Sequence, residues 1–118
     1  MLIATIFLLI FAVISGVFLG VYIFFGKTYP PIALAIAHGA SALTALALAI
    51  AGSMGASAAP LLKVALAALV VAALGGAFLF SCQLRGKPHP WPALVAHALL
   101  AFGGFVGFTL AALTSLAR

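Results

Sequence analysis

The hydropathy pattern divides the chain into four long apolar runs separated by short polar breaks. Each run approaches or exceeds the ~20 mainly apolar residues that an α-helix needs to cross the hydrocarbon core of a membrane. None of them shows the alternation of apolar and polar positions that is typical of a membrane β-strand. The pattern therefore predicts one transmembrane domain over residues 1–118, with helices at about 2–25, 32–54, 61–82 and 91–116.

The breaks contain residues that end one helix and begin the next. They lie at 26–31, 55–60 and 83–90, and each contains both glycine and proline. Proline is tolerated in the first turn of a helix, where its missing N–H would have no partner in any case. Connections this short place consecutive helices antiparallel and side by side. We therefore expect an all-α fold, an up-down-up-down four-helix bundle.

The composition indicates an integral, multi-pass membrane protein in contact with the lipid bilayer. Of the 118 residues, 68% are hydrophobic and 4% charged, whereas about a quarter are charged in soluble domains. The uncharged stretch 1–26 lacks a basic leading segment and exceeds the ~7–15-residue apolar core of a signal peptide, so we expect it to remain as the first helix. The single cysteine, Cys82, cannot form an internal disulfide and is expected to be a small buried residue.

The basic residues are scattered at the ends of the apolar runs. Lys27, Arg85 and Lys87 lie in the first and third breaks, and Lys63 and Arg118 belong to the opposite end of the predicted bundle. Such scattered charges do not form a nucleic-acid-binding patch. The positive-inside rule favours a cytoplasmic location for the first and third breaks.

Two histidines occupy matching positions in the two halves of the chain. A similar stretch precedes each one, residues 26–34 before His38 and residues 86–94 before His97. The Gly-Lys pairs that open these stretches are 60 positions apart, and the histidines are 59 apart. The similarity is explained either by an internal repeat of two hairpins or by two membrane-surface turns that converged on one sequence.

Both histidines lie about two turns inside an apolar helix. At ~1.5 Å per residue, His38 and His97 are each about 10 Å below the same end of the bundle. An ionisable side chain at this depth is costly and usually functional. Because the second and fourth helices are diagonal neighbours, the two imidazoles can hold one ligand between them. The alternative is a pair of neutral imidazoles hydrogen-bonded across the helices.

Glycines on the other two helices are predicted to lie at the level of the histidines. Gly16 and Gly20 belong to the first helix, and Gly75 and Gly76 belong to the third. Glycine allows a close approach to the backbone, as a flat macrocycle between the helices would require. The alternative is helix packing, since Gly16-xxx-Gly20 and the motif at 103–107 both fit the small-xxx-small pattern.

This arrangement resembles the four-helix haem-binding bundles of membrane b-type cytochromes. The resemblance implies one haem b per chain, with His38 and His97 as axial ligands of the iron. Members with two haems carry a second histidine on each ligand helix, and this chain has none there. The resemblance also implies that glycines make room for the porphyrin, namely Gly16, Gly20, Gly75 and Gly76. It further implies that basic residues neutralise the haem propionates, namely Lys27, Arg85 and Lys87.

The expected function is electron transfer in a bacterial inner membrane, with a quinol or a redox protein as partner. If the protein is an enzyme, we expect a haem-dependent membrane oxidoreductase. It would act with a partner, as a dimer, or on one face of the membrane only.

We expect the second nitrogen of each histidine to donate to a carbonyl or to a hydroxyl such as that of Ser41 or Thr44. His89 is expected to lie at the membrane surface. A role in receiving electrons or in contacting a propionate remains open. The alternatives are a cofactor-free accessory subunit of a larger complex and a haem carrier or sensor.

The absence of Asp and Glu excludes several classes of function. Proton-coupled exporters that use an intramembrane carboxylate, glycosidases, aspartic proteases and carboxylate-bridged metal enzymes all need these residues. Ser41 lies one turn from His38, but the third member of a catalytic triad is missing. One cysteine and two methionines are too few for soft-metal transport.

Overall fold

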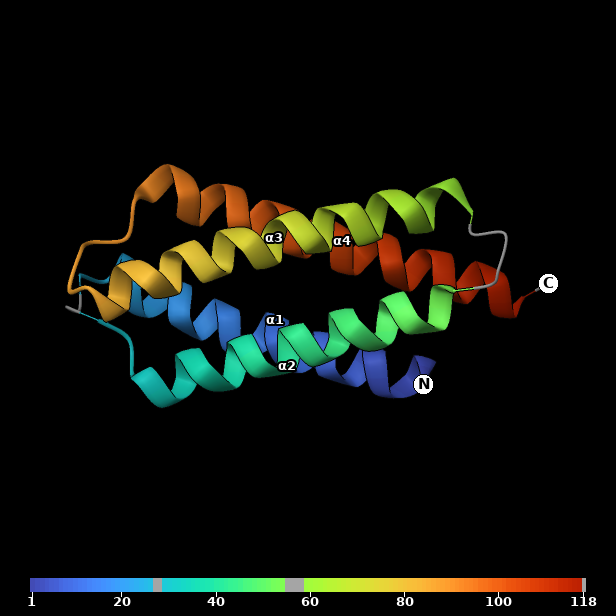
Figure 1. Ribbon diagram of the computed structural model, residues 1–118, viewed down its shortest axis with the longest axis horizontal. Coiled ribbons are helices and arrows are strands. Elements are labelled where there is room, and N and C mark those ends of the chain that lie inside the picture. Colours follow the sequence, from blue (N-terminus) through green and yellow to red (C-terminus); the bar gives the residue numbers. More distant parts are fainter. Residues whose placement is uncertain (27–28, 55–58, 118) are drawn as a thin grey trace.

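A computed structural model describes residues 1–26, 29–54 and 59–117 of the protein. The described chain forms a bundle of four antiparallel helices with extents of 48 × 23 × 20 Å (Figure 1). Each helix is long and apolar enough to cross a membrane. The predicted all-α four-helix bundle is thus confirmed, with α1 (Leu2–Phe24), α2 (Ile32–Ser53), α3 (Pro60–Leu84) and α4 (Trp91–Leu116).

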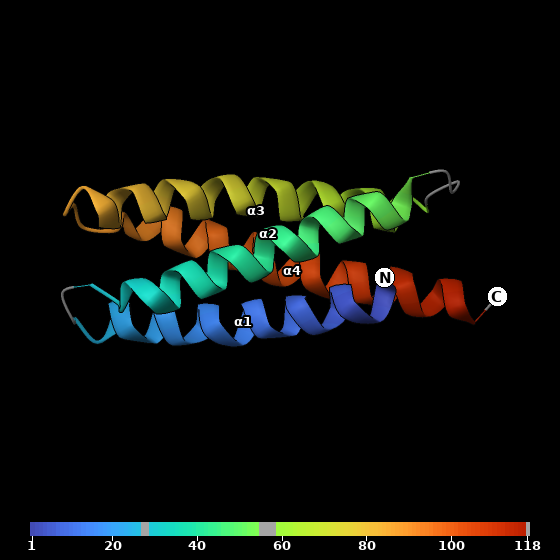
Figure 2. The ribbon, with the colours of Figure 1, turned by 60° about the horizontal axis from the view of Figure 1, so that its bottom comes forward.

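The bundle consists of two helical hairpins. α1 packs most closely on α2, and α3 packs most closely on α4. The hairpins meet through contacts of α2 with α3 and of α1 with α4 (Figure 2). α2 and α4 therefore occupy diagonal corners, and both begin at the end of the bundle where α1 and α3 finish.

The turns at this end explain why the two halves match imperfectly in sequence. Gly26 and Gly86 follow α1 and α3 and adopt φ angles of 69° and 64°, a left-handed conformation that glycine adopts without strain. They are 60 positions apart, whereas Pro31 and Pro90, which precede α2 and α4, are 59 apart. The one-residue difference therefore lies within the turns. Each hairpin places its histidine six positions after the first residue of its second helix.

The interior is packed with small residues, and this allows α3 and α4 to approach closely. A Cβ atom on Gly104 would lie 2.7 Å from the side chain of Leu69, and one on Gly107 would lie 3.1 Å from Cβ of Ala65. Gly103 is exposed, and no described atom lies within 4 Å of its Cβ position. The packing motif is therefore Gly104-xx-Gly107, and the predicted role of Gly103 in packing is wrong.

The outer surface is covered by large apolar side chains. A soluble monomer rarely exposes a continuous apolar surface of this extent, whereas a bilayer solvates it. Cys82 is buried, as expected. The most exposed apolar side chains come from all four helices and include Ile3, Phe7, Leu43, Val64, Leu74, Leu99 and Leu116.

Candidate functional site

His38 and His97 meet near the axis of the bundle. Each lies six positions after the first residue of its helix, Ile32 or Trp91, so both lie ~9 Å along their helices. Their ring centroids are 6.1 Å apart, and their planes are inclined by 80°. The two diagonal helices thus bring both imidazoles to one level, close together and with their planes nearly perpendicular.

Each imidazole is anchored to the backbone of the neighbouring helix in its hairpin. Nδ1 of His38 lies 2.9 Å from the carbonyl oxygen of Ala12, and Nδ1 of His97 lies 2.8 Å from that of Ala72. A carbonyl oxygen can only accept, so each Nδ1 carries the proton and donates it. Each Nε2 therefore keeps its lone pair. This is the tautomer that metal-binding histidines adopt when a backbone carbonyl orients them.

The hydroxyls expected to orient the histidines bond elsewhere. Ser41 Oγ donates to the carbonyl oxygen of His38, and Thr44 Oγ1 donates to that of Ala40, both within α2. A different hydroxyl comes near a ring, since Ser15 Oγ lies 3.4 Å from Nδ1 of His38. The backbone of α1 and α3 therefore supplies the main partners.

Two of the predicted glycines make room for the imidazoles themselves. A Cβ atom on Gly16 would lie 2.9 Å from Cε1 of His38, and one on Gly76 would lie 3.0 Å from Cε1 of His97. Such distances are too short for carbon atoms in contact. Any larger residue at either position would push the ring out of its place.

The other two glycines differ from each other. A Cβ atom on Gly75 would lie 3.5 Å from Cβ of His97, an ordinary contact distance. No described atom lies within 4 Å of the Cβ position of Gly20, which borders open space. Of the four glycines, Gly20 is therefore the one whose Cβ position is free for a bound molecule.

The two imidazoles line a cavity of about 460 Å³. Cavities that bind small molecules usually measure about 300–1,000 Å³ and are mainly apolar, with a few polar groups. This cavity fits that description, and it runs from the histidines to the end of the bundle where α2 and α4 begin. Its glycines and polar lining residues are Gly16, Gly20, Gly39, Gly76, His38, His97, Gln83 and His89.

The cavity also opens sideways, between α2 and α3. Ile36, Ala40 and Leu43 of α2 and Ala77 of α3 line the cavity and are also exposed on the outer surface. The interior is therefore continuous with the lipid-facing side of the molecule.

Two of the predicted basic residues, Arg85 and Lys87, do not line this cavity. Arg85 is exposed and donates to the carbonyl oxygen and to Oγ of Ser81 at 3.1 Å each, within α3. Lys87 is exposed, and neither residue lines the cavity. Lys27 lies outside the described residues. The polar side chains at the rim are instead those of Gln83 and His89.

Some of these residues could have been found in the sequence. Ala12 and Gly16, and equally Ala72 and Gly76, are four positions apart and repeat at an offset of 60. That repetition marks the helix face against which each histidine packs. The sequence offered only a weak indication that Gln83 belongs to the site, namely that it is an amide near the end of an apolar helix. It donates from Nε2 to the carbonyl oxygen of Pro30 at 2.9 Å and so connects the two hairpins.

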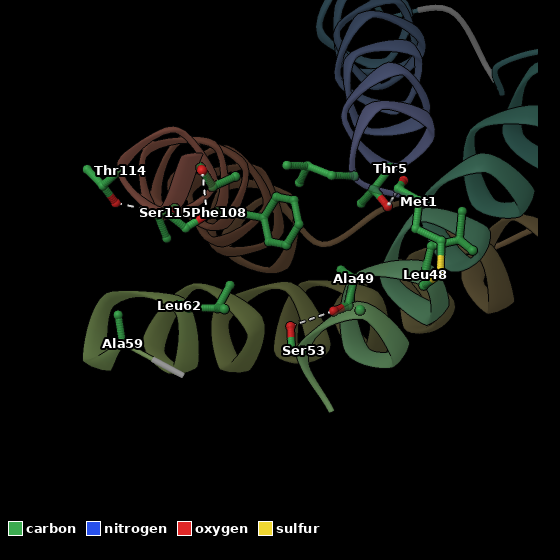
Figure 3. Close-up of a pocket in the computed structure, with 14 residues that line it drawn as sticks. Met1, Thr5, Leu48, Ala49, Ser53, Ala59, Leu62, Phe108, Thr114 and Ser115 are labelled. Atoms are coloured by element: carbon green, nitrogen blue, oxygen red, sulfur yellow. Dashed lines mark hydrogen bonds between the residues drawn. The ribbon is translucent and has the colours of Figure 1, made fainter. Parts of the chain in front are cut away.

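A second cavity of about 410 Å³ lies at the opposite end of the bundle (Figure 3). Its hydroxyls are used within their own helices: Thr5 donates to the carbonyl oxygen of Met1, and Ser53 donates to that of Ala49. No histidine, cysteine, lysine or arginine side chain lines it among the described residues. All three histidines therefore line the first cavity.

The site defines a class of protein, a four-helix membrane bundle with two imidazoles facing each other in an internal cavity. Within the described residues, no cluster of three or more histidine, cysteine or acidic side chains could hold a bare metal ion. Comparisons with protein-family models, with curated proteins and with solved structures find no match. The functional argument therefore rests on the geometry of the site.

Proposed function

We propose that this protein is a membrane haem-b protein that holds one haem per chain between His38 and His97 and transfers electrons. The observation that carries the proposal is the pair of facing imidazoles, each with Nδ1–H bonded to a carbonyl and with Nε2 free. A metal with two protein ligands needs its remaining ligands from elsewhere, and a porphyrin supplies four in one plane.

The distance between the rings fits this assignment. A metal ion bound at about 2 Å to one nitrogen of each ring places the centroids roughly 6 Å apart, since each centroid lies about 1 Å behind its nitrogen. The observed separation of the centroids is 6.1 Å. The cavity of about 460 Å³ beside them and the open space at Gly20 supply volume for a macrocycle.

The donor set favours electron transfer over the binding of oxygen. When bound, haem would supply a one-electron iron couple, and His38 and His97 would both hold its iron. The carbonyl oxygens of Ala12 and Ala72 hold the rings in orientation and raise the basicity of each Nε2. The apolar cavity wall keeps water from the site. A net charge of +5 without any acidic residue suits a dianionic ligand.

The position of the site has a consequence for partners. The histidines lie ~9 Å along their helices, whereas the hydrocarbon core is ~30 Å thick. One haem at this depth exchanges electrons at the end of the bundle where α2 and α4 begin. A quinol or a redox protein there, or a second copy of the chain, completes the electron path. A bacterial inner membrane is the location that we propose.

An absorption spectrum tests the proposal. The protein, expressed with ample haem and purified in detergent, is expected to show a strong Soret band and sharp bands after reduction. His38→Ala and His97→Ala should each abolish these bands, and Thr44→Ala, on the same helix as His38, should leave them unchanged. A folded, helical protein without pigment would contradict the proposal and favour a cofactor-free accessory subunit.

One observation favours a second candidate, a haem carrier or sensor. The cavity opens between α2 and α3 onto the lipid-facing surface, which offers a route for haem to enter and leave. Both candidates predict the same spectrum. They differ in the rate at which haem passes to an acceptor such as apomyoglobin: a carrier releases it within minutes, and an electron-transfer protein retains it for hours.

A further inference from the structure

The polar rim of the cavity contains a third histidine, whose ring nitrogens have no hydrogen-bond partner among the described residues. His89 lines the cavity and is partly buried, and its ring packs edge-on against Tyr29, with centroids 6.1 Å apart. The hydrogen bonds of the described residues engage neither of its nitrogens. Both nitrogens therefore remain able to bond to a molecule in the cavity.

Among the described residues, His89 is the titratable side chain that lines the rim. Gln83 also lines the cavity, but one N–H of its amide is used by the carbonyl of Pro30. Arg85 is held by Ser81 on the outside of α3. A ligand in the cavity therefore meets the imidazole of His89 and the remaining polar atoms of Gln83.

The sequence adds a second argument, which concerns charge. The chain has no Asp or Glu, so no acidic side chain of its own can pair with the imidazolium form of His89. Partial burial lowers the pKa of His89 in the free protein, and a bound anion would act in the opposite direction. The rim thus suits a ligand with an apolar body and an anionic end.

We propose that His89 binds a carboxylate at the outer end of the cavity ligand, with Gln83 as a neighbouring hydrogen-bond donor. This inference rests on the proposed function, in which the ligand is haem and the carboxylates are its propionates. It replaces the expectation that Arg85 and Lys87 neutralise these groups.

Titration of the haem-free protein with two ligands tests the inference. One ligand is haem b, and the other is its dimethyl ester, in which both propionates are neutral. His89→Ala is expected to weaken binding of haem b about tenfold, the scale of a hydrogen bond to a charged group, and to leave binding of the ester unchanged. His89→Arg should restore the affinity for haem b. Lys87→Ala, an exposed cation in the same turn, serves as the matched control and should bind both ligands as the unmodified protein does.

Three outcomes would overturn the inference. Equal weakening of both ligands by His89→Ala would show that the residue acts on the structure of the turn, and His89→Gln with circular dichroism checks this independently. Unchanged binding of haem b would show that the carboxylates are recognised elsewhere, while the His38→Ala and His97→Ala spectra still support the proposed function. Failure of the unmodified protein to bind either ligand would overturn the proposed function and this inference together.

Discussion

The two histidines have similar anchoring contacts, and one difference between them lies in a side chain near His38. Ser15 places its Oγ 3.4 Å from Nδ1 of His38. The equivalent position in the second hairpin, 60 residues later, is Gly75. His38 therefore has a second acceptor near its N–H group, and His97 has only a carbonyl.

This difference predicts opposite shifts of the redox potential in two variants. Ser15→Ala removes a hydrogen-bond acceptor near the N–H of His38 and so lowers the basicity of that imidazole. A less basic ligand favours ferrous iron, and the midpoint potential should therefore rise. The expected rise is roughly 20–50 mV, which corresponds to the energy of a weak hydrogen bond. Gly75→Ser adds the matching hydroxyl beside His97, where a Cβ atom finds an ordinary contact at 3.5 Å, and the potential should fall. Spectroelectrochemical titration measures both values. Shifts of the same sign in the two variants would disagree with this account.

The close contact of glycine with each imidazole leads to a second prediction at this scale. Gly16→Ala and Gly76→Ala would force each ring away from its rotamer, at a cost of about 0.5–1.5 kcal/mol. Haem affinity should fall severalfold to tenfold in either variant, measured by titration of the haem-free protein, with helical content retained. Gly103→Ala is the matched control, because no described atom lies within 4 Å of its Cβ position. Unchanged affinity in Gly16→Ala would mean that the ring is free to move.

At the scale of helices, α3 and α4 are held together by their smallest residues. Gly104 is buried against α3. A Cβ atom added to it would lie 2.7 Å from the side chain of Leu69 and 3.2 Å from the carbonyl oxygen of Ala65. These contacts leave no space for a methyl group unless the two helices move apart.

Gly104→Ala is therefore expected to destabilise the protein, although alanine is the better helix former. Overpacking of a tight interface costs about 1–3 kcal/mol, which exceeds the ~0.5–1 kcal/mol that alanine gains over glycine in a helix. Thermal unfolding followed by circular dichroism should show a lower midpoint for Gly104→Ala. Gly103→Ala, one position earlier on the exposed side, should raise the midpoint or leave it unchanged. The opposite order of the two variants would place the interface on the other face of α4.

These elements also show what could be predicted from the sequence. The four helices follow from hydropathy, because a bilayer dictates both the length and the apolar character of each span. The equal depth of His38 and His97 follows from counting along helices of fixed rise. The sequence could not show which glycine of the pair at 103–104 is buried. Adjacent positions point about 100° apart, and small changes in helix rotation exchange them.

The side chains that line the outer part of the cavity were also hard to predict from the sequence. Arg85 and Lys87 lie at the correct end of the bundle, but the side chain of Arg85 returns to Ser81 on its own helix. His89, only two positions after Lys87, lines the cavity. A charge pattern gives the membrane level of a residue, whereas the direction of its side chain depends on the shape of the turn.

At the scale of the whole molecule, two hairpins pack together, and the cavity that contains both imidazoles lies between them. Each hairpin contributes one imidazole, one anchoring carbonyl and one glycine under the ring. The contacts within each hairpin are more extensive than those between hairpins. The seam between α2 and α3 is less extensive than the contacts within either hairpin, and exposed residues of both helices line the cavity there.

This seam predicts that haem enters from the bilayer. Ala40 of α2 lines the cavity and is exposed, so Ala40→Trp should obstruct the opening and slow the uptake of haem by the protein in liposomes severalfold, with the final spectrum unchanged. Ala47, also exposed on α2, does not line the cavity, and Ala47→Trp is the matched control for an added lipid-facing ring. Stopped-flow absorbance at the Soret band measures the rate. Equal rates in the two variants would mean that haem reaches the histidines from the end of the bundle, past Gln83 and His89.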